Sequence, residues 1–154
     1  MITSVNITQE REGVRLIARK KRIWYPGAVY HVMERGIRRK EIYKDDIDYQ
    51  VFMAIMKHAI EKNGSVVHAY CMMTNHFHLL LETSGKEPGR FMKHLASSYA
   101  IYFNRKYSYT GHLFEGRYKA CLVEDDAYFL QTSRYIHLNP VKAKLVEHPE
   151  DYPW

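Results

Sequence analysis

The sequence predicts an α+β fold of the ferredoxin-like, split βαβ type, an antiparallel sheet with helices on one face and an additional C-terminal helix. Three observations support this fold class. Short β-branched and aromatic runs alternate with amphipathic segments in the order β-α-β-β-α-β, and a further helix follows. The 154 residues are enough for one domain with its own core. No apolar run approaches the ~20 residues of a membrane-spanning helix, so we expect no membrane partner.

The first half of the chain supplies three strands and one helix. A strand is expected over 28–36, after Pro26-Gly27 and before Gly36. A helix follows, because acidic residues at 45, 46 and 48 precede apolar residues spaced by three and four, and it ends near Asn63-Gly64. Two strands, 65–73 and 77–82, then form a hairpin around Thr74-Asn75.

The second half supplies two helices and the fourth strand. Apolar positions from Phe91 to Phe103 repeat with helical spacing, after a turn over 85–89. The fourth strand is expected over 118–123. Asp125 and Asp126 then begin the last helix, with residues 128, 129, 132, 135, 136 and 139 on one side, and Pro140 interrupts it.

We expect a single domain over 19–154, preceded by an N-terminal extension over 1–18 that shows neither helical nor strand periodicity. Cys71 and Cys121 lie in apolar, strand-like stretches, and the N-terminus lacks the apolar segment of a secretory signal. These features favour an intracellular, reducing location, the cytoplasm.

The charge distribution is compatible with nucleic-acid binding. The chain carries a formal charge of +6 and a pI near 9.2. Residues 18–40 hold eight Lys or Arg and one Glu, interleaved with aromatic rings, and a second basic and aromatic stretch covers 90–119. Cations that hold phosphates and rings on which bases stack suit a single-strand binder. On composition alone, a solvated face over a tyrosine-rich core explains them equally well. The candidate DNA contacts are Arg19, Lys20, Lys21, Arg22, Arg35, Arg38, Arg39, Arg105, Arg117 and Lys119.

The segment "TNHFHLLLE" (74–82) places two histidines one residue apart in a strand. Side chains at i and i+2 leave the same face, so His76 and His78 point together while Phe77 points the other way. Paired imidazoles suggest a metal ion. With nine histidines in the chain, this spacing arises by chance about once in two such sequences, so an incidental pair is an alternative. His31 either approaches the same ion or packs within the first strand.

The last helix supplies what the histidine pair lacks. Tyr135 and Asn139 in "RYIHLNP" are four residues apart and project from one side of a helix, whereas His137 points elsewhere. Two imidazoles and an amide oxygen form a neutral ligand set that leaves positions on a divalent ion open for phosphate oxygens and water. The alternatives are a packed aromatic for Tyr135 and a helix cap before Pro140 for Asn139.

A tyrosine near such an ion could attack phosphorus. An ordinary tyrosine, with a pKa of about 10, is protonated at neutral pH and needs a base or an activated electrophile. A cation on the scissile phosphate activates the electrophile, and the phenolate is a fair leaving group, so the ester would be reversible. Strand transfer would then need no external energy source.

Five segments together resemble the REP-associated tyrosine transposases of the single-tyrosine HUH transposase superfamily. They are "YPGAVYHVMERG", "DDIDYQVF", "AYCMMTNHFHLLLE", "YFNRKYSYTGHLFEGRYKA" and "RYIHLNPVKAKLVEHPEDYPW". The resemblance runs from about Arg19 to Trp154, and "NHFHLLLE" and "YIHLNPV" are its most specific parts.

The resemblance implies an endonuclease and strand transferase that uses Mg²⁺ or Mn²⁺ and cuts single-stranded or hairpin-forming repeat DNA. The cut leaves a 5′-phosphotyrosine and a 3′-hydroxyl. It assigns His76, His78 and Asn139 as metal ligands and Tyr135 as the nucleophile, and a homodimer is compatible with it.

Two alternatives remain at this point. One is a domesticated DNA- or RNA-binding protein that no longer cleaves; the presence of all four site residues argues against it. The other is a metal-dependent hydrolase of small phosphoesters, which would usually carry a carboxylate to prepare water and no excess of basic and stacking residues. A metal-dependent covalent adduct with single-stranded DNA would separate the three.

Overall fold

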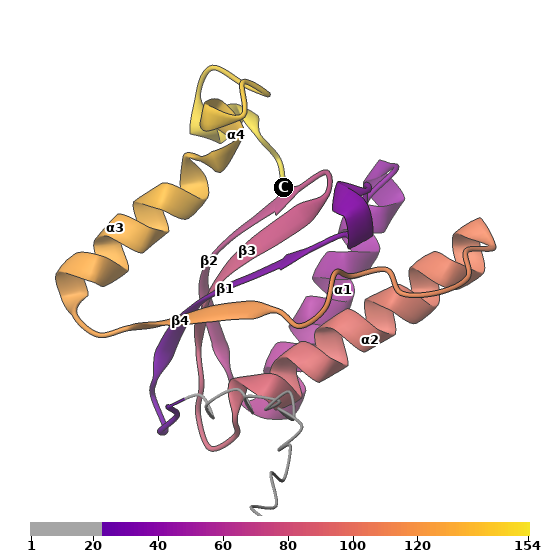
Figure 1. Ribbon diagram of the computed structural model, residues 1–154. Helices are drawn as coiled ribbons and strands as arrows, with labels where there is room; N and C mark the ends of the chain where they lie inside the picture. The colour runs from indigo at the N-terminus through magenta and orange to yellow at the C-terminus, as the bar shows by residue number, and fades with distance from the viewer. Residues whose placement is uncertain (1–22) are drawn as a thin grey trace, which may run out of the picture.

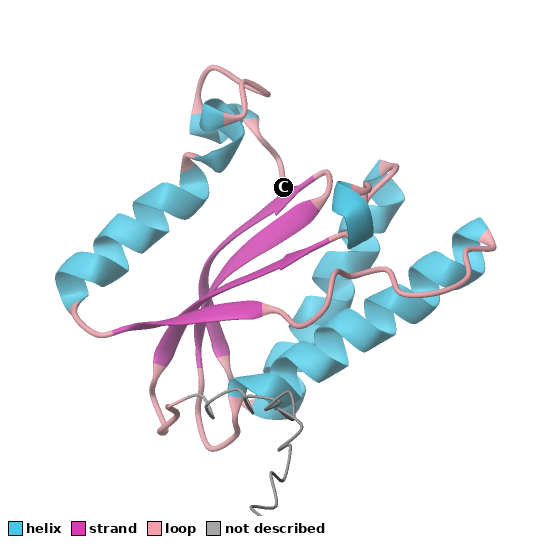
Figure 2. Ribbon diagram, viewed as in Figure 1, coloured by secondary structure: helices cyan, strands magenta, loops and turns pink. Residues whose placement is uncertain are grey.

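The computed structural model describes residues 23–154 (Figure 2). Its longer elements, in chain order, are β1 (Val29–Arg35), α1 (Asp46–Asn63), β2 (Val66–Met73), β3 (His76–Glu82), α2 (Pro88–Tyr107), β4 (Lys119–Val123), α3 (Asp126–His137) and α4 (Asn139–Lys142). The predicted order is confirmed. The predicted extension over 1–18 lies outside the described residues.

The four strands form one sheet in the order β2-β3-β1-β4, and each neighbouring pair is antiparallel. β1 and β3 are therefore central, while β2 and β4 are the edges. This is the strand order of the predicted ferredoxin-like fold. β4 begins at Lys119, one residue later than expected, where pairing with Met33 of β1 begins.

The helices cover both faces of the sheet (Figure 1). α1 and α2 lie on one face, where they enclose the larger core, which includes Phe52, Phe77, Leu95 and Tyr99. α3 lies on the other face and closes a smaller core. The residues buried there are Ala69, Cys71, Met73, Leu80, Val123 and Ile136.

Local chemistry sets the ends of the helices. The Asp45 side chain accepts a hydrogen bond from the Asp48 backbone N–H at 3.0 Å, and Asp125 accepts one from the Tyr128 N–H at 2.7 Å. α1 ends at Gly64, whose φ of +65° is the left-handed conformation that favours glycine. Within residues 23–154, no helix combines the length and apolar character needed to cross a bilayer.

The last helix differs in detail from the prediction. α3 ends at His137, and Pro140 lies in the first turn of a separate short helix, α4. The six positions expected on one side of this helix do not share one environment. Thr132 and Ile136 are buried against the sheet, whereas Tyr128 and Tyr135 are 37% and 39% exposed. The two tyrosines therefore lie at the rim of the contact between α3 and the sheet.

Candidate catalytic site

His76 and His78 lie on the face of β3 that α3 covers. Residues along a strand alternate between faces, so Phe77 enters the core beneath α1 and α2, as predicted. β3 is a central strand with helices over both faces, and His78 is accordingly only 2% exposed. His76, at the start of the strand, is partly buried.

The neighbouring strand brings a third histidine to this pair. The register pairs His78 with Met33, so His31 lies diagonally across from His78 on the same face. The Nε2 atom of His31 lies 2.9 Å from Nδ1 of His78, within hydrogen-bond distance, and the two rings stack with centroids 5.1 Å apart. His31 therefore contacts one of the predicted metal ligands.

Asn75 makes the corresponding contact with His76. Its Oδ1 lies 2.7 Å from Nδ1 of His76, and its amide nitrogen donates to the Arg39 carbonyl at 3.1 Å, which fixes the orientation of the amide. Both strand histidines thus use Nδ1 for a hydrogen bond inside the protein. If Nδ1 carries the proton in each, Nε2 is the atom left to bind a metal.

The protonation state of these rings also suits metal binding. Burial lowers the pKa of His31 and of His76, and the Arg35 charge adds to the effect on His76. Burial, with smaller effects from His76, His31 and Arg35, lowers the pKa of His78 to about 3. A neutral imidazole keeps the lone pair that a metal requires.

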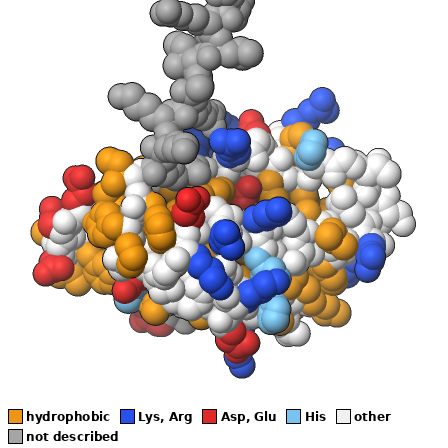
Figure 3. All heavy atoms as spheres, turned by 90° about the horizontal axis from the view of Figure 1, so that it is seen from below, with side chains coloured by type: hydrophobic (Ala, Val, Ile, Leu, Met, Phe, Trp, Pro, Cys, Tyr) orange, Lys and Arg blue, Asp and Glu red, His pale blue; other side chains and the backbone are white. Residues whose placement is uncertain are grey.

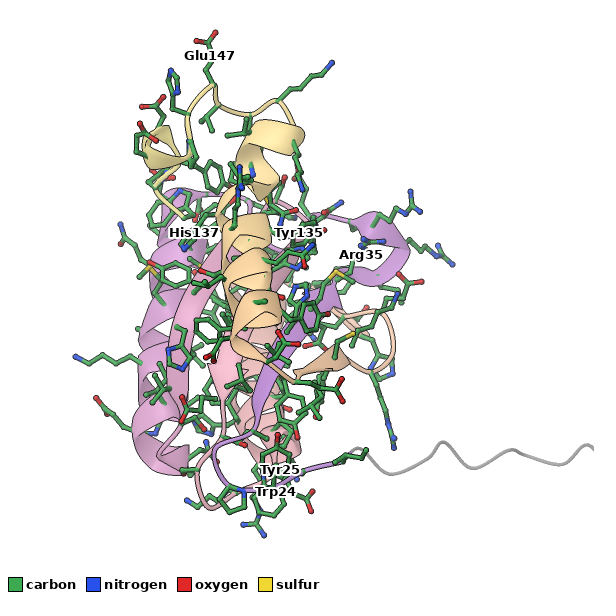
Figure 4. The ribbon with its side chains drawn as sticks, turned by 90° about the vertical axis from the view of Figure 1, so that its left-hand side faces the viewer. Trp24, Tyr25, Arg35, Tyr135, His137 and Glu147 are labelled. Atoms are coloured by element: carbon green, nitrogen blue, oxygen red, sulfur yellow. The ribbon has the colours of Figure 1, made fainter. Side chains whose placement is uncertain are left out.

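Tyr135 projects from α3 toward the same histidines. Its ring centroid lies 5.7 Å from those of His31 and His78, and both contacts are edge-on. The Nζ atom of Lys142 lies 4.5 Å from the centroid of the Tyr135 ring, a cation–π contact. Figure 4 shows Tyr135 and Arg35 on one flank of α3 and His137 on the other, as the helical spacing predicted.

A cavity of about 400 Å³ separates α3 from the sheet at this point. Its walls include His31 and His78 from the central strands, Lys119 from β4, and Tyr128 and Tyr135 from α3. A tyrosine side chain, two imidazole rings and a cation therefore surround one space that is large enough for a phosphodiester group.

Asn139 is placed beside Tyr135. Its amide nitrogen donates to the Tyr135 carbonyl at 2.9 Å, which leaves Oδ1 as the free metal-binding atom of the side chain. Among residues 23–154, no three His, Cys, Asp or Glu side chains are arranged as a ready metal site. A metal ion held by His76 and His78 would therefore need a further ligand of another type, such as an amide or phosphate oxygen. A role for Asn139 as that ligand remains a prediction.

The predicted basic residues fall into several groups. Lys119 lines the cavity, and Arg35 is close enough to influence His76 and His78 electrostatically. Arg38 and Arg39 are exposed just after β1, in the left-handed conformation (φ +54° and +58°), and the Asn75 contact ties Arg39 to the site. Arg105 is exposed in the last turn of α2 and Arg117 in the loop before β4. Residues 19–22 lie outside the described residues.

The sequence analysis did not identify Asn75 or Lys142 as site residues, and it did not decide whether His31 approaches the metal or packs within its strand. Asn75 was interpreted only as a hairpin turn residue, although its position next to His76 was visible. Lys142 reaches Tyr135 only because the chain resumes a helical path at α4 after the interruption.

Comparison with known proteins identifies the family. The sequence matches the family "Transposase IS200 like" over residues 25–139, which is most of the chain. The chain belongs to the IS200-like transposase family. This match contains both strand histidines, Tyr135 and Asn139. No protein with a curated description matches the chain significantly.

Two solved structures share the fold of this family member. One is a REP-associated tyrosine transposase bound to a REP hairpin, with a TM-score of 0.75, 15% identity, and coverage of 90% of this chain and 81% of that chain. The other is a putative transposase from Deinococcus radiodurans R1, with a TM-score of 0.53, 20% identity, and coverage of 77% of this chain and 95% of that chain. The predicted resemblance to REP-associated tyrosine transposases is confirmed at the level of fold and family.

Proposed function

We propose that this IS200-like transposase is a metal-dependent endonuclease and strand transferase that cuts single-stranded DNA beside a hairpin. The observation that carries the proposal is the position of Tyr135, whose ring lies 5.7 Å from those of His31 and His78 across a shared cavity. The hairpin preference is supported by the similar transposase, which was solved bound to a REP hairpin.

The proposed step is an exchange of phosphodiester bonds. Tyr135 Oη attacks the scissile phosphorus; the new P–O bond to tyrosine forms as the bond to the 3′ oxygen breaks. The phenol proton passes to solvent, and the departing oxygen takes a proton to become a 3′-hydroxyl. The ester to Tyr135 retains the 5′ phosphate. Attack by another 3′-hydroxyl reverses these changes and joins a different strand.

The residues that line the cavity, and those beside it, would have separate roles in this step. His76 and His78 would hold Mg²⁺ or Mn²⁺ through Nε2, with Asn139 as the third protein ligand. When bound, the ion offsets charge on the phosphate oxygens and on the leaving oxygen. Lys119 adds positive charge to the cavity wall, and Lys142 holds the Tyr135 ring in place.

Formation of a covalent adduct tests the proposal. The protein is incubated with Mn²⁺ and a 3′-labelled hairpin that carries a single-stranded flank, then denatured, separated by electrophoresis and digested. Label is expected on a peptide containing Tyr135, and excess chelator should abolish it. Cleavage without an adduct would support the phosphoester-hydrolase alternative. Binding with neither cleavage nor adduct would support the non-cleaving DNA-binding alternative.

A further inference from the structure

A second basic site lies far from the tyrosine, at the opposite end of the sheet. The C-terminal end of α1 and the N-terminal half of α2 enclose a groove of about 610 Å³. Its basic residues are Lys62, Lys86, Arg90, Lys93 and His94. The groove lies beside the end of β3, at the face of the sheet that α1 and α2 cover, whereas His76 begins β3 and faces α3. Seven strand residues, roughly 20 Å, separate these ends.

Among residues 23–154, no acidic side chain forms an ion pair with a cation of this groove. Within residues 23–154 the ion pairs join His68 to Glu82 and Lys106 to Asp45 and Asp48, so none uses a cation of the groove. No described residue that lines the groove is an Asp or Glu. Figure 3 views the molecule from this end and shows several Lys and Arg side chains gathered with histidine.

The backbone holds the cations in a defined arrangement. The Lys86 ammonium donates to the Lys62 carbonyl at 2.6 Å, which places it over the last turn of α1. Lys93 and His94 lie three and four residues after Arg90, so both neighbour Arg90 on one face of α2. Ser97 extends this row to about 10 Å of helix, a length over which duplex DNA carries about six phosphate charges.

The residue types that line the groove favour paired over unpaired DNA. Single-strand sites combine cations with aromatic rings on which bases stack. Among the residues that the structure describes, no Phe, Tyr or Trp lines this groove. By contrast, a pocket beside β1 combines Lys40 and Lys44 with Phe103 and Tyr109. A lining of Lys, Arg and Ser, with no aromatic side chain, suits the phosphate backbone of duplex DNA, whose bases are paired and not available for stacking on protein rings.

We infer that this groove binds consecutive phosphates of the double-stranded stem of the hairpin, while the unpaired flank enters the cavity at Tyr135. The inference rests on the proposed function for the identity of the DNA. It adds a second, sequence-independent contact that would hold the stem at a fixed position relative to the cleavage site.

The test compares a groove variant with the wild-type chain. Lys62→Gln, Arg90→Gln and Lys93→Gln are combined, because all three side chains are exposed and their loss should not affect folding. Affinities for a flanked hairpin, and for the single-stranded flank alone, are measured by fluorescence anisotropy at several salt concentrations with chelator present. The variant is expected to bind the hairpin at least tenfold more weakly, with the slope of log K against log salt reduced by two to three, roughly 0.9 per lost contact. Its affinity for the flank alone should be unchanged.

A matched single substitution controls for net charge. Lys57 is an exposed lysine of α1 outside the groove, so Lys57→Gln is expected to alter hairpin binding far less than Lys93→Gln. Equal effects of these two substitutions, or equal losses on hairpin and flank, would overturn the stem-binding role. If the wild-type protein binds and cleaves the hairpin and the triple variant matches it, the groove inference alone fails. If the wild-type protein does not bind hairpin DNA, the proposed function fails with it.

Discussion

His31 and His78 contact each other through Nε2 and Nδ1, 2.9 Å apart, across the two central strands of the sheet. This contact positions the His78 ring and supports the tautomer that leaves Nε2 for a metal. His31→Ala should therefore weaken Mn²⁺ binding by about 10- to 100-fold, the usual effect of losing such a supporting contact. His31→Gln, which can still accept a hydrogen bond, should recover part of the loss. Isothermal titration with Mn²⁺ measures both.

The control for this prediction is His58→Ala. His58 is an exposed histidine of α1 on the other side of the sheet, so its loss should leave Mn²⁺ affinity unchanged. Wild-type affinity in the His31→Ala protein would show that His31 is only a packed strand residue.

Both strand histidines should be required for cleavage. His76→Ala or His78→Ala leaves too few protein ligands to hold an ion that also binds substrate oxygens, so we expect scission to fall to the level seen with excess chelator. Circular dichroism should show a retained fold. The exposed His112 provides a comparison, since His112→Ala should cleave normally. Undiminished cleavage by the wild-type protein in chelator would contradict metal dependence.

Replacing Tyr135 by Phe should separate binding from chemistry. The change removes one oxygen and keeps the ring against His31, His78 and Lys142, so hairpin affinity should stay within about twofold. Cleavage and the covalent adduct should disappear. Tyr128 lines the same cavity and has similar exposure, so Tyr128→Phe is the matched control and should retain both. An adduct that survives in the Tyr135→Phe protein and maps to Tyr128 would reassign the nucleophile.

Glu34 should make folding stability depend on pH. This residue is 7% exposed, its Oε2 has no hydrogen-bond partner among the described residues, and burial raises its pKa from 4.5 to about 7. Between these values the folded chain binds a proton that the unfolded chain has lost, so stability falls as pH rises. Relative to Glu34→Gln, the wild-type protein should lose up to about 3 kcal/mol between pH 4.5 and 7.

Urea unfolding of both proteins at pH 5, 6, 7 and 8 measures this difference. A gap between the wild-type protein and Glu34→Gln that stays constant over this range would contradict the raised pKa of Glu34.

The sequence predicted the order of the elements because its signals are local. Asp45 and Asp125 cap helices through their own following turns, and Gly64 ends α1 with its own backbone conformation. Strand alternation likewise predicted that His76 and His78 share a face. The different environments of Thr132 and Tyr135 were not predictable, because helical spacing gives the sides of α3 but not how deeply each side packs on the sheet.

The sequence predicted which site residues share one strand or one helix, but not which residues of different elements meet. The meeting of His31 with His78 depends on the register between β1 and β3, which brings together residues 47 positions apart. The groove likewise depends on how α1 packs beside α2, because Lys62 and Arg90 belong to different helices. No pattern within one segment indicates either arrangement.

The short connection between β4 and α3 keeps Tyr135 on the sheet of its own chain. Only residues 124 and 125 separate Val123 from the start of α3, and Ile136 is buried against the same sheet that carries the histidines. If the proposed site is correct, one chain supplies both the tyrosine and the histidines, and we expect that turnover per molecule will not vary with protein concentration. Mixing the Tyr135→Phe and His76→Ala proteins should not restore activity, because the tyrosine of one chain would not act with the histidines of another.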